Sequence, residues 1–330
     1  MEVAVESGKR TSKIDMKRKV LITGGAGFIP SSLADRLVKD ENYFVVLVDN
    51  MLTGKKLNVT KAPNCKFIKC DVNSYNDIAP VMTAYQFDYV FHYAAVVGVQ
   101  RTLDNPVMVL NDIQGIKNVL DLAKNTGVKR VFYSSSSEVY GEPVELPQRE
   151  LTTPLNSRLP YAVVKNLGEA FCRSYKTEYD LNFTIFRFFN TYGPKQSEDF
   201  VISKFLNLAL QGKDIPVYGD GNQTRTFCYI EDNLDATLKA LNHDLFVNDV
   251  VNIGNDQVYT VKELAEIIIE VTGSDSKIVH LPALTEGDMN RRQPDVTNMK
   301  ILLGRDFKSL QEGIEEILIL RGKKARITTY

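Results

Sequence analysis

Tyr161 and Lys165 are four positions apart, a spacing that places two side chains on the same face of a helix. A lysine ammonium group near a phenol favours the phenolate and lowers a tyrosine pKa that is ordinarily about 10. Such a phenolate can remove the proton of a hydroxyl group while a hydride leaves the same carbon. This spacing alone is weak evidence, because Tyr and Lys are also common surface neighbours on helices.

A run of four serines, residues 134–137, lies upstream of this pair and is followed by Glu138. The run continues an apolar stretch, 130–134, that we predict to be a strand. In a parallel sheet, residues just after a strand lie at the edge where ligands bind. The serine hydroxyls are therefore placed to hydrogen-bond a reacting oxygen.

A glycine-rich turn separates an apolar strand at 20–23 from a helical pattern, and a second strand at 44–48 ends in Asp49. Gly24 permits the tight turn, and Gly27 lets backbone N–H groups approach a pyrophosphate at the helix N-terminus. Asp49 is placed to accept hydrogen bonds from the adenosine ribose hydroxyls, which favours NAD over NADP. One position departs from the fingerprint, because the third glycine is Pro30, which is compatible with the first turn of a helix.

Strands and helices alternate through the first half of the chain, which predicts an α/β fold with a Rossmann-type, doubly wound parallel sheet. Further helical patterns are expected at 107–125 and 161–179. The remaining predicted strands of this half are 66–69, 89–92 and 183–188.

The alternation loosens after residue 190, which predicts a smaller, mixed α/β substrate lobe over residues 191–330 and a cofactor-binding domain over 19–190. Residues 1–18 are polar and are expected to form a disordered extension. The elements expected in the lobe half are helices at 200–210, 232–243 and 261–272 and a strand at 215–218.

The composition is that of an ordinary globular protein, with 44% hydrophobic and 25% charged residues and a net charge of -1 over 330 residues. No basic excess indicates nucleic acid, and no long apolar run indicates a membrane span. The four cysteines and three histidines show no metal-binding spacing, so no metal site is predicted and reduced, cytoplasmic thiols are expected.

The motifs TGGAGFI, a strand-ending aspartate, SSSSEVYG and YxxxK, in this order, resemble the extended short-chain dehydrogenase/reductase family that acts on nucleotide sugars. The resemblance extends from about Arg18 to Leu303. It implies an enzyme that binds NAD and a nucleotide-diphosphate sugar and oxidises the sugar C4 hydroxyl to a ketone. It also implies a homodimer in which the helices at 107–125 and 161–179 pair.

The resemblance also implies roles for individual residues. Tyr161 would be the base, Lys165 would bind the nicotinamide ribose, and Ser136 would bind the C4 oxygen, with Glu138 as a further catalytic group. Cofactor contacts are implied for Gly24, Gly27, Phe28, Ile29, Asp49, Asn50, Asp71, Val72, Ala94, Ala95 and Ser134, and substrate contacts for Ser137, Asn190, Arg225 and Arg292.

The fate of the 4-ketone stays open at this point. Ser136-Ser137-Glu138 with Arg225 matches UDP-glucuronate decarboxylases, whereas the segments 94–101 and 195–199 resemble 4-epimerases. A 4,6-dehydratase and a dehydrogenase that releases the 4-ketone are alternatives. A noncatalytic NAD-binding regulator is a rival from another class, since a fold does not determine a function.

Overall fold

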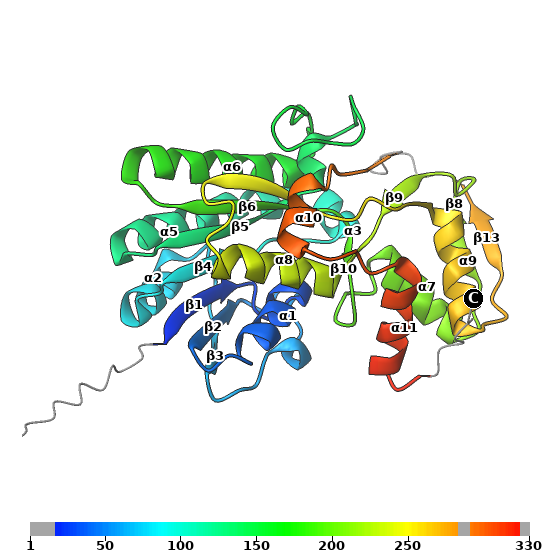
Figure 1. Ribbon diagram of the computed structural model, residues 1–330, viewed down its shortest axis with the longest axis horizontal. Coiled ribbons are helices and arrows are strands. Elements are labelled where there is room, and N and C mark those ends of the chain that lie inside the picture. Colours follow the sequence, from blue (N-terminus) through cyan, green and yellow to red (C-terminus); the bar gives the residue numbers. More distant parts are fainter. Residues whose placement is uncertain (1–16, 283–290, 324–330) are drawn as a thin grey trace, which may run out of the picture.

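The computed structural model describes residues 17–282 and 291–323 of the chain. In this part, a seven-stranded sheet has the order β11-β6-β5-β4-β1-β2-β3, and every neighbouring pair runs parallel (Figure 1). The six predicted strands of the first half are confirmed as β1 to β6, and their ends agree with the prediction to within two residues. The strands are β1 (Arg18–Thr23), β2 (Tyr43–Asp49), β3 (Cys65–Lys69), β4 (Tyr89–His92), β5 (Arg130–Ser136), β6 (Phe183–Phe188) and β11 (Asp249–Ile253).

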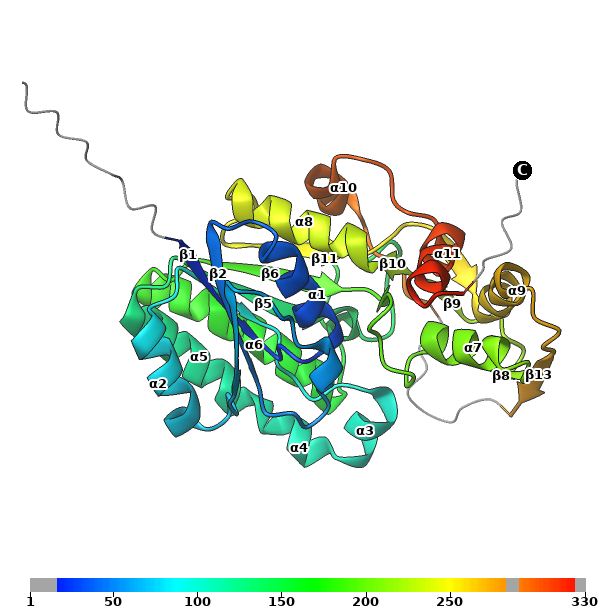
Figure 2. The ribbon, with the colours of Figure 1, turned by 90° about the horizontal axis from the view of Figure 1, so that it is seen from below.

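Helices cover both faces of this sheet, as a doubly wound fold requires (Figure 2). A separate apolar core lies on each face, and the core under α1 and α8 continues into the second lobe. One face carries α2 (Tyr75–Tyr85), α4 (Pro106–Leu110), α5 (Asp112–Thr126) and α6 (Pro160–Tyr179). The other carries α1 (Phe28–Leu37), α8 (Ile230–Asn242) and α10 (Thr297–Leu303).

The strand order reverses between β1 and β4, because the chain proceeds from β1 toward β3 and from β4 toward β11. In such a sheet, a crevice forms where the connections leave in opposite directions at the carboxyl ends of the strands. The glycine turn after β1 and the loop after β4 both open into this crevice. The fold therefore places the predicted cofactor residues at one edge of the sheet.

Three details differ from the sequence-based expectations. The single helix expected at 107–125 is two helices, α4 and α5, separated at Asn111; α5 then begins with Asp112, and a carboxylate is favoured in a first helical turn. Arg18 is the first residue of β1 rather than part of an extension, because it pairs with Tyr43 of β2. Residues 1–16 lie outside the described part of the chain.

The chain returns to the sheet after residue 190. β11 pairs with β6 along its whole length, and α8 packs against α1, although both come from the later half of the sequence. The edge strand β11 was not predicted. Its position matters for the site, because the segment that leads into α10 lies beside it (Figure 1).

The second lobe lies beyond the carboxyl edge of the sheet (Figure 1). Its α11 was not predicted from the sequence, although Ser309 and Glu312 form a reciprocal capping box at its start. The lobe contains α7 (Val201–Leu210), β8 (Ile215–Tyr218), α9 (Val261–Thr272), β13 (Ile278–Leu281) and α11 (Leu310–Leu320). The remaining short elements are η1 (Lys56–Asn58), α3 (Val99–Asp104), η2 (Ser137–Tyr140), β7 (Thr191–Tyr192), β9 (Thr224–Thr226), β10 (Cys228–Tyr229) and β12 (Val258–Thr260).

Candidate active site

Two adjoining cavities open at the carboxyl ends of the strands. The larger has a volume of about 1220 Å³ and the smaller about 280 Å³. They share part of their walls, including Pro30, Tyr93 and Ala95. We name them the cofactor cavity and the catalytic cavity, after the predicted residues that line each of them.

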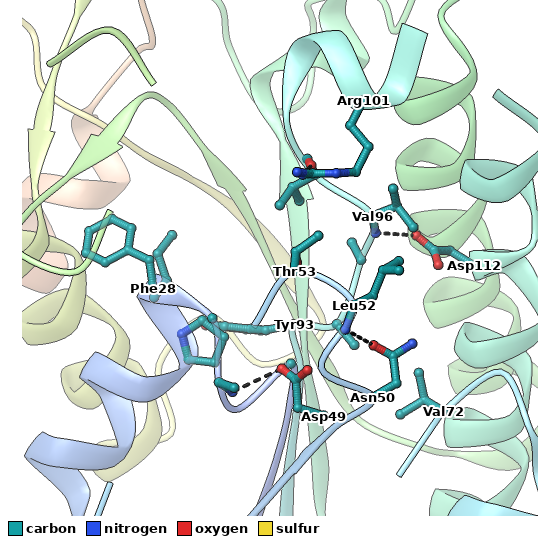
Figure 3. A pocket seen from close by; sticks show the side chains of 18 of the residues that line it. Phe28, Asp49, Asn50, Leu52, Thr53, Val72, Tyr93, Val96, Arg101 and Asp112 are labelled. Carbon is teal, nitrogen blue, oxygen red and sulfur yellow. Dashed lines mark hydrogen bonds between the residues drawn. The ribbon is translucent and has the colours of Figure 1, made fainter. Parts of the chain in front are cut away.

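The cofactor cavity collects residues from the ends of β1, β2, β3 and β4 (Figure 3). Apart from Ser134, Tyr161 and Lys165, every residue predicted to contact the cofactor lines this cavity. These residues are Gly24, Gly27, Phe28, Ile29, Asp49, Asn50, Asp71, Val72, Ala94 and Ala95.

The glycine turn leaves room for a ligand to approach the backbone. Gly24 has a φ of +70°, and a Cβ there would lie 3.0 Å from the backbone of Ala94. A Cβ on Gly27 would lie 3.0 Å from the Gly24 carbonyl oxygen. Gly27 precedes the first turn of α1, where N–H groups without helical partners are available to an anion. The turn therefore fits the pyrophosphate of a dinucleotide.

Pro30 does not disturb the helix that follows this turn. It is buried at the third position of α1, and the helix continues to Leu37. A proline in the first turn sacrifices no helical hydrogen bond, because the N–H at this position has no partner within the helix. The departure from the three-glycine fingerprint is thus accommodated locally.

The Asp49 carboxylate orders the end of β2 and the glycine turn together (Figure 3). One oxygen accepts the Ala26 N–H at 3.0 Å and the other accepts the Met51 N–H at 2.7 Å. A carboxylate has about four acceptor positions. Two positions are therefore left over, which is the capacity that two ribose hydroxyls require.

Thr23 and His92 form a buried pair under the cavity floor that the sequence did not indicate. The Thr23 hydroxyl oxygen accepts the N–H groups of Tyr93 and Ala94, each at 3.0 Å, and lies 3.0 Å from His92 Nδ1. Its single hydrogen must therefore be donated to Nδ1, which makes His92 a neutral ring protonated at Nε2. Burial lowers the pKa of His92 to about 3, which is consistent with this assignment.

The catalytic cavity brings together the predicted residues of β5, η2 and α6 with two from the later half of the chain. Arg225 is the exception: it lies on β9, donates to the Thr224 carbonyl, and lines neither cavity. The residues that line the catalytic cavity as predicted are Ser134, Ser136, Ser137, Glu138, Tyr161, Lys165, Asn190 and Arg292.

Lys165 is buried and held by the end of β5. Its ammonium group donates to the Ser134 carbonyl at 2.7 Å and lies 3.3 Å from the Ser134 hydroxyl. It lies 5.7 Å from the centre of the Tyr161 ring. Burial lowers the pKa of Lys165 to about 8, and the nearby Asp112 carboxylate opposes this shift.

The pKa of Tyr161 is raised, whereas the sequence predicts that Lys165 lowers it. Burial raises it above the ordinary value and the Glu138 carboxylate raises it further, while the hydrogen bond with Ser136 and the charge of Arg292 act in the opposite direction. A lowered pKa is therefore wrong for the protein chain by itself. The reason is that desolvation of the phenolate outweighs the nearby positive charges.

Glu138 and Arg292 form an ion pair at the other end of the catalytic cavity. A guanidinium nitrogen of Arg292 lies 2.7 Å from a carboxylate oxygen of Glu138, and the side chains of Arg292 and Glu138 are 9% and 21% exposed. The Nε–H of Arg292 is buried and finds no acceptor within residues 17–282 and 291–323. The guanidinium of Arg292 nevertheless lines the catalytic cavity.

Sequence reasoning missed two further residues of the cofactor cavity (Figure 3). Asp112 accepts the Val96 N–H at 2.7 Å and so fixes the loop after β4. Arg101 of α3 lies across the cavity from the glycine turn and pairs with Asp199 of the lobe at 3.7 Å. Asp112 lies inside the helix predicted at 107–125, so its place at a helix start had no signal in that prediction, and the Arg101 pair has no local sequence signal either.

The sequence model of the NAD dependent epimerase/dehydratase family matches residues 20–254. This chain belongs to that family. Membership confirms the predicted relationship to nucleotide-sugar short-chain dehydrogenases/reductases, the assignment as an enzyme, and NAD as the cofactor.

Two curated members of related function show how far the likeness extends. The chain is 38% identical to a UDP-N-acetyl-alpha-D-glucosaminuronate decarboxylase of Bacillus cytotoxicus, over 86% of this chain and 91% of the relative. It is 35% identical to UDP-glucuronic acid decarboxylase 1 of Xenopus tropicalis, over 94% of this chain and 73% of that protein.

Among solved structures, UDP-glucose 4-epimerase of Thermotoga maritima with UDP-glucose superimposes with a TM-score of 0.86 at 31% identity. The match covers 92% of this chain and 99% of the epimerase. In the part of the chain that the structure describes, no helix is both long and apolar enough to span a membrane.

Proposed function

We propose that this enzyme uses NAD to oxidise C4 of a UDP-linked uronic acid and then removes the sugar carboxylate as CO₂. The observation that carries this proposal is the Glu138–Arg292 pair, which lies in the same small cavity as Tyr161 and Ser136. A neutral sugar offers nothing at C6 that requires a buried guanidinium. A uronate offers a planar carboxylate, which a guanidinium can bind with two parallel hydrogen bonds.

The first step is the removal of the C4 hydroxyl proton by Tyr161, which lines the same cavity as Ser136. NAD bound in the cofactor cavity would supply the acceptor for the C4 hydride, and the positive charge of its oxidised nicotinamide would oppose the raised pKa of Tyr161. The Lys165 ammonium group, which donates to the Ser134 carbonyl, would bind the ribose next to the nicotinamide.

The second step follows from the chemistry of a β-keto acid. With a ketone at C4, the bond between C5 and the carboxylate carbon breaks, and its electron pair is delocalised into the ketone as CO₂ leaves. The Arg292 guanidinium would bind the carboxylate, and Glu138 orients Arg292. A proton taken up from water, directly or by way of Glu138, replaces CO₂ at C5. Return of the hydride to C4 and of the proton from Tyr161 to the oxygen completes a UDP-pentose.

Arg292 variants test the carboxylate contact directly. We expect wild-type protein to bind UDP-glucuronate more tightly than UDP-glucose, and Arg292→Met to remove this preference by weakening UDP-glucuronate binding about 10- to 100-fold. Isothermal titration in the presence of NAD measures both ligands. Equal affinity of the wild-type protein for the two ligands would contradict a uronate substrate, and Arg225→Met is the control, because Arg225 lines neither cavity.

A 4-epimerase is the second candidate, favoured by the close match to the Thermotoga maritima structure along 99% of that chain. In that case Glu138 would only hold Arg292 in place. A product of unchanged mass with inverted configuration at C4, formed from UDP-glucose, would support the epimerase over the decarboxylase.

We also propose a homodimer that pairs the α4–α5 and α6 faces of two copies. Five apolar side chains on α4 and α6 are partly or largely exposed: Val107 is 70%, Met108 37%, Leu110 40%, Val163 42% and Tyr179 49% accessible. Burial of such a patch stabilises association. Light scattering is expected to give twice the mass of the chain, and a monomer at micromolar concentration would contradict this.

A further inference from the structure

Tyr140 is a buried tyrosine directly behind the catalytic cavity, which it does not line. It is the last residue of η2, the short turn that carries Glu138. Its hydroxyl donates to Asn252 Oδ1 at 2.7 Å and accepts a hydrogen bond from the Arg187 guanidinium at 2.8 Å. Tyr140 therefore ties the Glu138 turn to β11 and β6.

Arg187 is itself rigidly held. Two of its nitrogens donate to the two carboxylate oxygens of Glu169, each at 2.8 Å, and Glu169 also accepts from the Ser135 hydroxyl at 2.6 Å. Both charged side chains are at most 2% exposed. Bidentate pairs of this kind fix geometry as well as charge. The Arg187 guanidinium, which donates to the Tyr140 hydroxyl, is therefore held in place by Glu169.

Asn252 continues the connection from β11 toward Arg292. Its side-chain amide donates to the Gln148 carbonyl at 2.9 Å. The Gln148 N–H donates to the Gln293 carbonyl at 2.8 Å, and the Asp295 N–H donates back to the Gln148 carbonyl at 2.7 Å. The segment that follows Arg292 is therefore fixed to Asn252 through Gln148.

These contacts close a ring. Glu138 and Tyr140 are two residues apart in η2, and Arg292 and Gln293 are neighbours in the chain. Hydrogen bonds connect Tyr140 to Asn252, Asn252 to Gln148, and Gln148 to Gln293. The ion pair between Arg292 and Glu138 completes the ring. Every hydrogen bond in the ring is 2.7–2.9 Å long. The ring joins parts of the chain that have no common element of secondary structure.

We propose that Tyr140 and Asn252 are positioning residues that hold Glu138 and Arg292 in register within the catalytic cavity. This inference rests on the proposed function in one respect, namely that the pair acts after C4 oxidation. A shift of about 1 Å in a reacting group can reduce turnover about 100-fold. Loosening the ring is therefore expected to slow loss of CO₂ while sparing the cofactor cavity, to which the ring residues make no contribution.

The chain provides a matched control at the opposite end of the sheet. Tyr43, at the start of β2, donates its hydroxyl to Asn242 Oδ1 at 2.5 Å and accepts from Arg18 at 3.3 Å. Tyr43 is also buried, but it lines neither cavity. Tyr140→Phe and Tyr43→Phe each remove one buried hydroxyl that bonds an arginine and an asparagine. A difference in kcat between the two variants therefore reports on the place of the hydroxyl beside the catalytic cavity and not on the loss of a buried hydroxyl as such.

For Tyr140→Phe we expect kcat for CO₂ release from UDP-glucuronate to fall at least tenfold, with KM and the Kd of NAD within twofold of wild type. Amide hydrogen exchange is expected to accelerate in 138–141 and 291–295 but not in 24–28. Tyr43→Phe is expected to leave kcat and these exchange rates within twofold. Asn252→Ala should reproduce the Tyr140→Phe effects, and the double variant should lose less than the product of the two.

Wild-type kcat and exchange rates in Tyr140→Phe would overturn the proposal, and so would an equal kcat loss in Tyr43→Phe. If the wild-type protein releases no CO₂ from UDP-glucuronate, the proposed function fails, but the exchange comparison still decides whether the ring holds the two segments. If Tyr140→Phe does not fold, Asn252→Ala provides the same two readouts.

Discussion

The two cavities of this enzyme are built in different ways. The cofactor cavity is lined mainly by short, local segments, each at the end of one strand of a parallel sheet, and the glycine turn and Asp49 shape it within one βαβ unit. The catalytic cavity includes Arg292, which lies between β13 and α10 in the sequence. A ring of hydrogen bonds that includes Asn252 of β11 connects the segment after Arg292 to the Glu138 turn. The cofactor cavity is thus formed mostly by neighbouring strand ends, whereas the Glu138–Arg292 pair of the catalytic cavity depends on contacts between distant segments.

Tyr161→Phe should give the largest effect and disable the catalytic cavity alone. Without the phenol oxygen no group accepts the C4 proton, so we expect the rate of NADH formation to fall about 10³-fold or more. Absorbance of NADH in a single turnover measures it. The Kd of NAD should stay within a few fold, and undiminished turnover would refute the role of Tyr161.

Glu138→Gln separates the two chemical steps. The amide keeps the shape of the side chain but loses its charge and its acid–base capacity, so we expect CO₂ release to fall about 100-fold. C4 oxidation, followed as NADH in the same reaction, should change less than fivefold. A parallel loss of both steps would mean that Glu138 acts on the first step or on the structure.

Gly24→Ala should disable the cofactor cavity alone. The new Cβ would sit in a left-handed conformation 3.0 Å from the Ala94 backbone, so we expect a loss of about 3 kcal/mol in unfolding free energy and at least tenfold weaker NAD binding. Gly127→Ala is the control, because Gly127 has a φ of +77° but no atom within 4 Å of the new Cβ. It should lose about 1 kcal/mol by chemical denaturation and bind NAD normally.

His92 should make the cofactor side of the sheet sensitive to acid. Its folded-state pKa of about 3 lies below the unfolded value of about 6.5, so the unfolded chain binds the proton first and stability falls as the pH drops through this window. Between pH 7 and pH 5 this contributes a loss of about 2 kcal/mol. His92→Asn should flatten the dependence in denaturation curves at the two pH values, and an unchanged slope would contradict the assignment.

Asp199→Asn should give the smallest effect. The Arg101–Asp199 pair connects α3 and the second lobe beside the cofactor cavity, but both side chains are at least 36% exposed. Exposed pairs contribute about 0.2–1 kcal/mol, so we expect NAD to dissociate about two- to fivefold faster in stopped-flow experiments. The effect should shrink as the salt concentration rises, and a salt-independent change would point to another cause.

The sequence predicts most of the central sheet, because strands such as β1 are buried on both faces and appear as continuous apolar runs. It does not predict β11, because the segment 249–253 has only three apolar residues. Two helices, α7 and α8, and several short strands separate it in the sequence from β6, the strand with which it pairs. It also merges α4 and α5 into one helix. Local periodicity cannot show that the chain turns at Asn111 and presents Asp112 to Val96.

The same limit applies to the site. Every predicted cofactor-binding position lines one of the two cavities, because strand ends in a parallel sheet converge by geometry alone. Arg225 and Arg292 both resembled phosphate- or sugar-binding arginines, yet only Arg292 reaches the catalytic cavity. The segment that follows Arg292 is held by contacts with Gln148 and Asn252 that no spacing rule predicts.

The most direct test of the central claim uses UDP-glucuronate that carries deuterium at C4, incubated with the purified protein and NAD in ordinary water. Mass spectrometry and proton NMR of the sugar nucleotide show which bonds have changed. We predict a UDP-pentose that has lost CO₂ and keeps deuterium at C4, because the hydride leaves and returns within one closed site. A product that retains its carboxylate, or recovery of unreacted substrate, would contradict the account.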